Sequence, residues 1–510
     1  MSVAFDFHTL SLTIDYTLEE YQKSTGSGDL VALMGIHLPE AGPVDRSKFL
    51  RFRHEHAHFT SFMATGLAEL YGIFSDYLLV FLFRVLQGNA EDLAGIELEL
   101  PLLMGEADDR LDDRTREIIL RAWQQINHAR AFFFGFGTRL SLAGLVDMQP
   151  QDDFWSIYFD ERFTPIVQRY YRLIASLKPE KADDPCVSQN RALPSILIQG
   201  RPRELTSRGV MEAYAITIEL LNTHFRKMES DLTFYGSPLV RDPGPLYTTA
   251  IEYALEHAGL PQSTTLEEYL AGKSPPEAYY LITALSFAAM QTPVVQKLDG
   301  EVIFEGNLHT LCSAYRFQGM VEALKEGKIP PLPADVRRKS DRAGLLTWLH
   351  ACNEALGDTV SLNIYGYVGR MFNQEARLQN MTRESQSLIE LSWAARANFI
   401  KEPTEYVLDA GLFAEIFPCQ VRYIRTLDGK IVAFGDTGTI QPRLISESAV
   451  PAFEAAVFAN QWDSAWAKMT EVSPDERAGR IALSLLSTAH LFGYIDQTQN
   501  PEMPKITLRI

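Results

Sequence analysis

Alternating and helical spacings of hydrophobic residues divide the first part of the chain. Residues 5–15, FDFHTLSLTID, alternate roughly as a β-strand would, and residues 29–38, DLVALMGIHL, form a second β-rich run after a flexible segment at 24–28. In residues 48–86 the apolar positions recur at the spacing of a helix instead. The pattern therefore predicts two strands followed by a long helix.

Individual residues indicate where this helix begins and bends. Pro43 breaks the chain before it, and Asp45 or Ser47 can cap its first turn. Gly66 and Gly72 are the expected bends, because glycine weakens a helix wherever it interrupts one.

Helical patterns dominate most of the remaining chain. Residues 110–145, 153–177 and about 207–229 predict helices, and further helices are expected from residue 246 onward. Residues 178–206 are rich in Pro, Asp, Lys, Asn and Arg and predict an exposed connection or lid. The fold class expected is α+β and predominantly α-helical.

Two hairpins and one linker interrupt the later helices. A short hairpin is predicted around Asp299, and a second near residues 421–435, where Asp428 and Gly429 suit a type I′ turn. The segment 328–344, KIPPLPADVRRKSDRAG, is rich in Pro and charge, which is typical of a domain boundary.

The chain is predicted to divide at this linker, because 510 residues exceed one ordinary core. Residues 1–335 would form a catalytic region with a small sheet, active-site helices and a helical insertion at about 90–206. Residues 340–510 would form a mostly helical carboxy-terminal region that includes the second hairpin.

Charge and cysteine content exclude several classes of protein. Lys and Arg total 47 against 65 for Asp and Glu, and the net charge of −18 argues against sequence-independent binding to nucleic acid or anionic lipid. The amino terminus lacks the features of a signal peptide, and the most apolar stretch is too short to span a bilayer. We therefore expect a cytoplasmic protein of unspecified oligomeric state. The cysteines are widely spread and are expected to be reduced and packed: Cys186, Cys312, Cys352 and Cys419.

The candidate chemistry lies in the first turns of the long helix. His54 and His58 enclose the pattern His-Glu-x-x-His, and positions i and i+4 of a helix share one face, so the two imidazoles can hold one zinc ion. Glu55 lies about 100° round the helix, within reach of a metal-bound water. Zinc brings the pKa of that water to about 7, so Glu55 as catalytic acid/base predicts hydrolysis of an amide in a peptide or protein.

The surroundings of the motif allow two interpretations. Four apolar residues would bury the face that carries the histidines: Phe59, Phe62, Met63 and Leu67. In the alternative, the motif is a solvated polar turn in which Arg51, Arg53 and His56 point to water. His56 projects away from its two neighbours, so we expect it to lie behind the ligands or in solvent rather than on the metal.

A third ligand is required, since catalytic zinc keeps three protein ligands and a water. The pattern HExxHxxGxxH is absent because Ser61 replaces its glycine, and the strongest candidate is Glu212, whose flanking alanines would allow close helix packing. Glu219 and Glu69 are the reserves, the latter only if the helix breaks at Gly66. The alternative is that Glu212 belongs to a solvated stripe with Arg208, Glu219 and Thr223.

With these residues the chain resembles the zincin metallopeptidases, and specifically the gluzincin group, over residues 29–230. The resemblance rests on His54, Glu55 and His58, and it implies a zincin-like core in which a glutamate on a later helix, here Glu212, is the third ligand. The segment RHEHAHFTSFMATG also resembles uncharacterised bacterial proteins that carry HExxH. The chain departs from the zincin pattern in having His and Thr where the family has uncharged and apolar residues.

Two other classes of function remain open on the sequence. A non-haem iron or di-iron oxidase in a helical bundle would need paired ExxH segments, which are not found; His350 and Glu354 form an isolated i, i+4 pair. A non-enzymatic scaffold with a degenerate metal site would use the carboxy-terminal region to bind its partner. Replacing Glu55 with Gln distinguishes an enzyme from such a scaffold.

Overall fold

The three-dimensional structure is a computed structural model, and it describes about two fifths of the chain. The described residues are 4–6, 11–25, 43–65, 67–68, 97–100, 194–225, 244–260, 264–291, 312–334, 336, 342–357, 392, 394–410, 423–428, 431–433, 443–444 and 506–509. Several predicted features lie outside these residues: the strand at 29–38, the helices at 110–145 and 153–177, the hairpin around Asp299, and the side chains of Glu69, Cys186 and Cys419.

Helices predominate in the described part of the chain, which confirms an α+β fold that is mainly helical. The helices are α1 (Leu18–Thr25), α3 (Pro43–Ala64), α9 (Ser207–Phe225), α12 (Pro245–His257), α13 (Leu266–Leu270), α14 (Pro276–Met290), α16 (Ser313–Lys325), α17 (Arg342–Ala355) and α21 (Pro403–Asp409). The strands are β1 (Ala4–Asp6), β2 (Ser11–Thr13), β3 (Glu97–Leu100), β4 (Ser195–Ile198), β5 (Arg201–Glu204), β6 (Tyr423–Arg425), β7 (Ile431–Ala433), β8 (Arg443–Leu444) and β9 (Ile506–Arg509). None of the described helices is long and apolar enough to cross a membrane.

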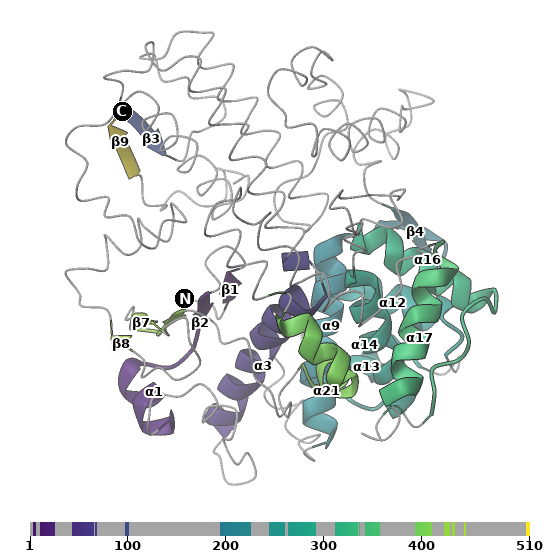
Figure 1. Ribbon diagram of the computed structural model, residues 1–510, viewed down its shortest axis with the longest axis horizontal. Coiled ribbons are helices and arrows are strands. Elements are labelled where there is room, and N and C mark those ends of the chain that lie inside the picture. The colour runs from purple at the N-terminus through teal and green to yellow at the C-terminus, as the bar shows by residue number, and fades with distance from the viewer. Residues whose placement is uncertain are drawn as a thin grey trace.

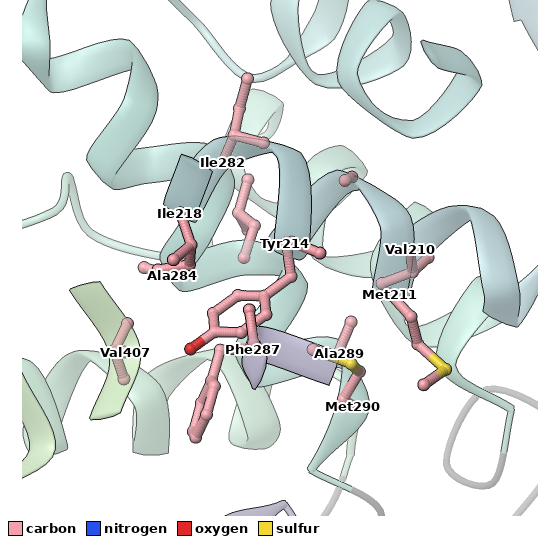
Figure 2. Close-up of a cluster of buried hydrophobic side chains, with 14 of the residues drawn as sticks. Val210, Met211, Tyr214, Ile218, Ile282, Ala284, Phe287, Ala289, Met290 and Val407 are labelled. Carbon is pink, nitrogen blue, oxygen red and sulfur yellow. The ribbon is translucent and has the colours of Figure 1, made fainter. Parts of the chain in front are cut away.

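Helices α9 and α14 form the centre of a bundle with α3, α12, α16, α17 and α21 around them (Figure 1). Both central helices are apolar on nearly every side, and such a helix is stable in water only when other elements cover it. Figure 2 shows Tyr214 of α9 packed beside Phe287 of α14 and facing Val407 of α21. The core of the bundle therefore joins segments that are far apart in the sequence.

The residues predicted as one amino-terminal strand form two. Strands β1 and β2 pair antiparallel, with Phe5 opposite Leu12, and they begin a five-stranded sheet of order β1-β2-β6-β7-β8. The predicted hairpin near 421–435 is confirmed as the antiparallel pair β6 and β7. Because β6 also pairs in parallel with β2, this sheet joins amino-terminal strands to strands from the last fifth of the chain.

The predicted exposed connection at 178–206 ends in a hairpin that the sequence analysis missed. Strands β4 and β5 pair antiparallel, and Gln199 and Gly200 between them have φ values of 51° and 72°. Two successive positive φ angles are those of a type I′ turn, which matches the twist of paired strands. Ile196 and Ile198 face inward while Leu197 is exposed, so the short alternation SILI was the available signal.

Helix α3 begins earlier than predicted. Its first residue is Pro43, so Asp45 and Ser47 lie inside the helix and neither caps it. Proline suits this position because the first turn of a helix has no partner for its N–H groups and the ring already holds the required φ. The helix ends at Ala64, next to the bend predicted at Gly66.

The predicted linker at 328–344 contacts the helices beside it over the part that the structure describes. Ile329 and Val336 are buried, and the Trp348 indole of α17 donates to the Pro330 carbonyl at 2.9 Å. Division into two regions at this linker stays a prediction, and residues from both sides of it share the sheet and the core. Cys312 and Cys352 are buried thiols, as expected.

Candidate metal centre

The candidate metal centre lies where α3 packs against α9. Both helices carry fully buried alanines, Ala57 on α3 and Ala213 and Ala215 on α9. The apolar residues expected to bury this part of α3 do so: Phe59, Phe62, Met63 and Leu67. The HExxH segment is therefore part of the core and not of a solvated turn.

The structure brings together the three predicted ligands, His54, His58 and Glu212. Glu212 Oε2 lies 3.1 Å from His54 Nε2 and 3.3 Å from His58 Nε2. The two imidazole rings are 4.9 Å apart at an interplanar angle of 86°. The three residues are only 5%, 6% and 4% exposed, in that order.

The arrangement of these atoms fits a divalent ion. Two ligand atoms about 2.0–2.1 Å from a tetrahedral zinc lie about 3.3–3.4 Å from each other, close to the distances between Glu212 and the imidazoles. One ligand atom from each of the three residues lies within 4.8 Å of the others. Within the described residues, this is the cluster of His, Cys, Asp and Glu side chains close enough to hold a metal.

The charges of these groups hold one another in their ionised forms. Burial by itself raises the pKa of Glu212, but the charge of His58 and hydrogen bonds from both histidines hold that pKa well below its ordinary value. Burial likewise lowers the pKa of His54, but hydrogen bonds to Glu212 and Glu219 raise it well above the ordinary value. Without a metal, the site is therefore a buried ion pair.

This ion pair predicts that the metal-free protein loses stability as the pH rises. The contribution of protonated His54 is complete below its ordinary pKa of 6.5 and is lost as the pH rises through the raised pKa. The contribution of ionised Glu212 to stability is complete above its ordinary pKa of 4.5 and is lost as the pH falls through the lowered pKa. Urea unfolding in the presence of a chelator gives the free energy of unfolding of the wild type and of His54→Gln at each pH. The difference between the two proteins is the contribution of the ion pair. An equal fall in both proteins above pH 6.5 would contradict the assignment.

Arg208 contacts the other oxygen of Glu212. Its Nε lies 3.3 Å from Glu212 Oε1, one turn away on α9, while the guanidinium side chain is 44% exposed. Oε1 thus faces Arg208 and Oε2 faces the histidines, an arrangement that orients the carboxylate for one-point coordination. The solvated-stripe alternative for Glu212 is wrong, because both Glu212 and Glu219 are buried.

Glu219 lies behind His54 rather than beside the other ligands. Its Oε2 is 3.5 Å from His54 Nδ1, whereas Glu212 faces Nε2 of the same ring. The two nitrogens of an imidazole point in different directions, so Glu219 would not face an ion held between Glu212 and the Nε2 atoms of the histidines. A buried carboxylate at Nδ1 fixes the tautomer and direction of a ligating histidine.

Replacing Glu219 with Gln is expected to weaken zinc binding by about 10–100-fold, the usual effect of removing such a partner. The amide keeps the size of the side chain but loses the charge that holds the Nδ1 proton. Competition with a chromogenic chelator measures the affinity. Glu252→Gln on α12 is the matched control, and an equal affinity in the two variants would show that Glu219 does not act on His54.

Arg53 and His56 are buried, so the alternative interpretation in which they point to water is wrong. Arg53 is 0% exposed and donates to the Asp409 carbonyl, and its Nη1 lies 3.5 Å from His56 Nδ1. Burial, and then the charge of Arg53, lower the pKa of His56 to about 3. Arg51 alone of the three is exposed, and it pairs with Asp15 at 2.7 Å. His56 is therefore a neutral core residue behind the site.

Glu55 is half-buried and its carboxylate is held by the sheet. Its Oε2 accepts a hydrogen bond of 2.7 Å from the backbone N–H of Phe5 in β1. The Phe5 ring packs edge-on against Phe59, so the strand is fixed on α3. The charge of Glu55 also helps to raise the pKa of His54.

Tyr247 is close enough to Glu212 to be affected by its charge, and sequence reasoning did not single it out among 20 tyrosines. It is half-buried in the first turn of α12, and its pKa is raised by burial and then by the charge of Glu212. The available signal was Gly209, where a Cβ would lie 3.2 Å from the Leu246 carbonyl. That glycine allows the first turn of α12 to pack closely on α9.

Other histidine and carboxylate pairs in the described residues do not resemble this centre. His350 and Glu354 form an exposed i, i+4 pair at 3.1 Å, and His257 contacts the neighbouring Glu256 at 3.5 Å. Neither pair gathers a third ligand within the described part of the chain. The paired carboxylate and histidine helices of a di-iron centre are thus not found among these residues.

Comparisons of the chain with protein-family models, with curated proteins and with solved structures find no match. The function is therefore inferred from the residues of the site and from their chemistry. The resemblance to zincins stays a prediction that rests on the HExxH segment and on Glu212 as the third ligand.

Proposed function

We propose that this chain is a zinc-dependent metallohydrolase and that it cleaves an amide bond in a peptide or protein. The observation that supports the proposal most is the position of Glu212. A buried carboxylate from a second helix directs one oxygen at Nε2 of both histidines of an HExxH motif. Neither the motif nor the carboxylate alone would distinguish a metal site from ordinary packing.

The set of ligand atoms favours a catalytic zinc site over a structural one. Two imidazoles and one carboxylate are ligands that zinc prefers, and structural zinc sites usually have four protein ligands, often cysteines. Three protein ligands leave room for water or substrate. Zinc held here supplies a Lewis acid that polarises a carbonyl group and brings the pKa of a bound water to about 7.

Glu55 is the group that we assign to proton transfer. It would accept a proton from the attacking water and return it to the leaving amine as general acid. The hydrogen bond from Phe5 N–H restricts the rotation of its side chain, so the carboxylate is positioned before substrate binds. Tyr247 is the hydroxyl that we assign to substrate, where it would donate a hydrogen bond to the carbonyl oxygen.

We propose that part of this α+β fold is a zincin-like core. It would comprise the strands β1 and β2, the HExxH helix α3 and the helix α9 that carries Glu212. The contact of β1 with α3 supports this grouping, because it joins a strand to the active helix at the proposed base. The gluzincin arrangement, with the third ligand on a later helix, is part of this proposal.

Metal analysis of the purified full chain tests the proposal directly. One equivalent of zinc is expected by plasma mass spectrometry, and it should be recovered after treatment with a chelator and reconstitution. Two equivalents of iron would instead indicate the oxidase. A chain that binds no divalent metal at micromolar concentration would overturn the proposed function.

A further inference from the structure

The carboxyl end of α21 contacts both helices of the candidate metal centre. Three carbonyl groups at this end accept hydrogen bonds from side chains of α3 and α9. Tyr214 of α9 donates to the Tyr406 carbonyl. Arg53 and Thr60 of α3 donate to the carbonyls of Asp409 and Ala410. The end of one short helix is thus capped by the two helices that carry the ligands.

These bonds satisfy groups that a helix leaves open. The last carbonyls of a helix have no partner within it, and their partial negative charge attracts cations. Ala410, which ends α21, has a φ of 47°, the left-handed conformation that turns the chain away after a helix. The Ala410 carbonyl accepts from Thr60 at 3.0 Å. The end of α21 is therefore shaped to meet α3.

Arg53 is the strongest of these contacts. Its guanidinium is completely buried, and one nitrogen donates both to the Asp409 carbonyl and, at 3.2 Å, to the Asp409 carboxylate. A buried cation is costly unless it is paired, so the two residues are expected to stay together. Arg53 directly precedes His54, so this contact holds the backbone next to a ligand.

Tyr214 gives α9 the matching contact. It lies two residues beyond Glu212, and its hydroxyl reaches the end of α21 that carries Val407 (Figure 2). Its ring packs on Phe287 of α14, with the centroids 5.7 Å apart. The position of α9 against α21 is thus fixed by a buried aromatic residue close to the third ligand.

The contacts to α21 lie on the side of α3 that does not carry the ligands. Arg53, His56 and Thr60 face α21, while His54 and His58 face α9. A change in the position of α21 would therefore shift α3 and α9 together or apart without touching a ligand. The separation of the imidazoles from Glu212 depends on that spacing.

We propose that the carboxyl end of α21 is a positioning element of the metal centre, with Arg53 as its positioning residue. The inference rests on the proposed function. In it, residues 403–410 control the affinity and the geometry with which His54, His58 and Glu212 would bind the ion. Arg53 contacts no ligand atom in this role; it acts through the backbone of α3.

The test uses the full chain with Zn²⁺ for affinity and Co²⁺ for geometry, because the visible absorption of Co²⁺ reports the arrangement of its ligands. Arg53→Met and Asp409→Asn are expected to weaken zinc binding by about 10-fold, at the low end of the effect of outer-shell partners, and to change the Co²⁺ spectrum. Arg53→Lys keeps a buried cation and should recover part of the zinc affinity and part of the wild-type Co²⁺ spectrum. Arg51→Met removes an exposed arginine two residues away and should change neither.

Circular dichroism first establishes which variants are folded. If Arg53→Met does not fold, Asp409→Asn and Thr60→Val decide, since each removes one contact and leaves the Arg53 cation in place. Folded variants with wild-type affinity and a wild-type Co²⁺ spectrum would overturn the positioning role while leaving the proposed function intact. A wild-type chain that binds neither ion would overturn both proposals.

Discussion

Changing His54, His58 or Glu212 to alanine is expected to abolish stoichiometric zinc binding. Each change removes one of three ligand atoms that lie within 4.8 Å of one another. The loss should exceed the about 10–100-fold that removal of an outer-shell partner costs, because the coordination bond itself is lost. Isothermal titration and metal analysis of the purified variants measure the effect.

The control for this experiment is His350→Ala, which removes a partly exposed histidine that pairs with Glu354 on α17. It should leave the zinc content unchanged. Glu212→Gln separates charge from volume, since the amide fills the same space between the imidazoles but is a much weaker ligand. If His54→Ala and His58→Ala are folded and still bind one equivalent, the ion lies elsewhere and the site assignment is wrong.

Glu55→Gln is expected to lower the rate of hydrolysis by about 10²- to 10⁴-fold while zinc stays bound, which is the range that general acid–base groups contribute. The amide cannot take the proton of the attacking water. Its oxygen can still accept from Phe5 N–H, the contact that Glu55 makes at 2.7 Å, so the fold of the site should be preserved. Cleavage of a defined mixture of peptides, followed by mass spectrometry, measures the rate.

Zinc content decides how a loss of hydrolysis in Glu55→Gln is interpreted. Loss of cleavage with one equivalent of metal supports Glu55 as acid/base, whereas loss of both would mean that the change disrupts the site. Glu252→Gln on α12 is the matched control and should cleave as the wild type does. Equal cleavage by Glu55→Gln and the wild type would remove Glu55 from the mechanism.

Local spacing was sufficient to predict that the two histidines of the motif lie side by side. Positions i and i+4 share a face of any helix, so His54 and His58 must lie on the same face once this segment is helical. The mainly helical fold class and the hairpin of β6 and β7 also follow from local pattern, because turn residues and hydrophobic spacing act over a few neighbours.

Local pattern left two interpretations open for the opposite face of the same helix. Arg53 and His56 are polar and close to other polar residues, which allowed a solvated turn, yet both are buried, and Arg53 donates to Asp409 of α21. Arg53 and Asp409 are 356 positions apart in the chain, and no spacing around residue 53 carries information about a residue so distant. The same limit applies to β2, because its parallel neighbour β6 is even more distant in the sequence, with Leu12 opposite Ile424.

Glu212 marks the division between what the sequence determined and what tertiary structure decided. The sequence determined a carboxylate on an apolar helix together with a solvated alternative, because its periodicity placed Glu212 and Glu219 on one stripe. Tertiary structure decided between them by packing α3 against that stripe, so that Glu212 meets Nε2 of both histidines and Glu219 meets Nδ1 of one. The physical reason is that burying a carboxylate requires partners, and the imidazoles that pair with Glu212 Oε2 come from a helix that lies far away in the sequence.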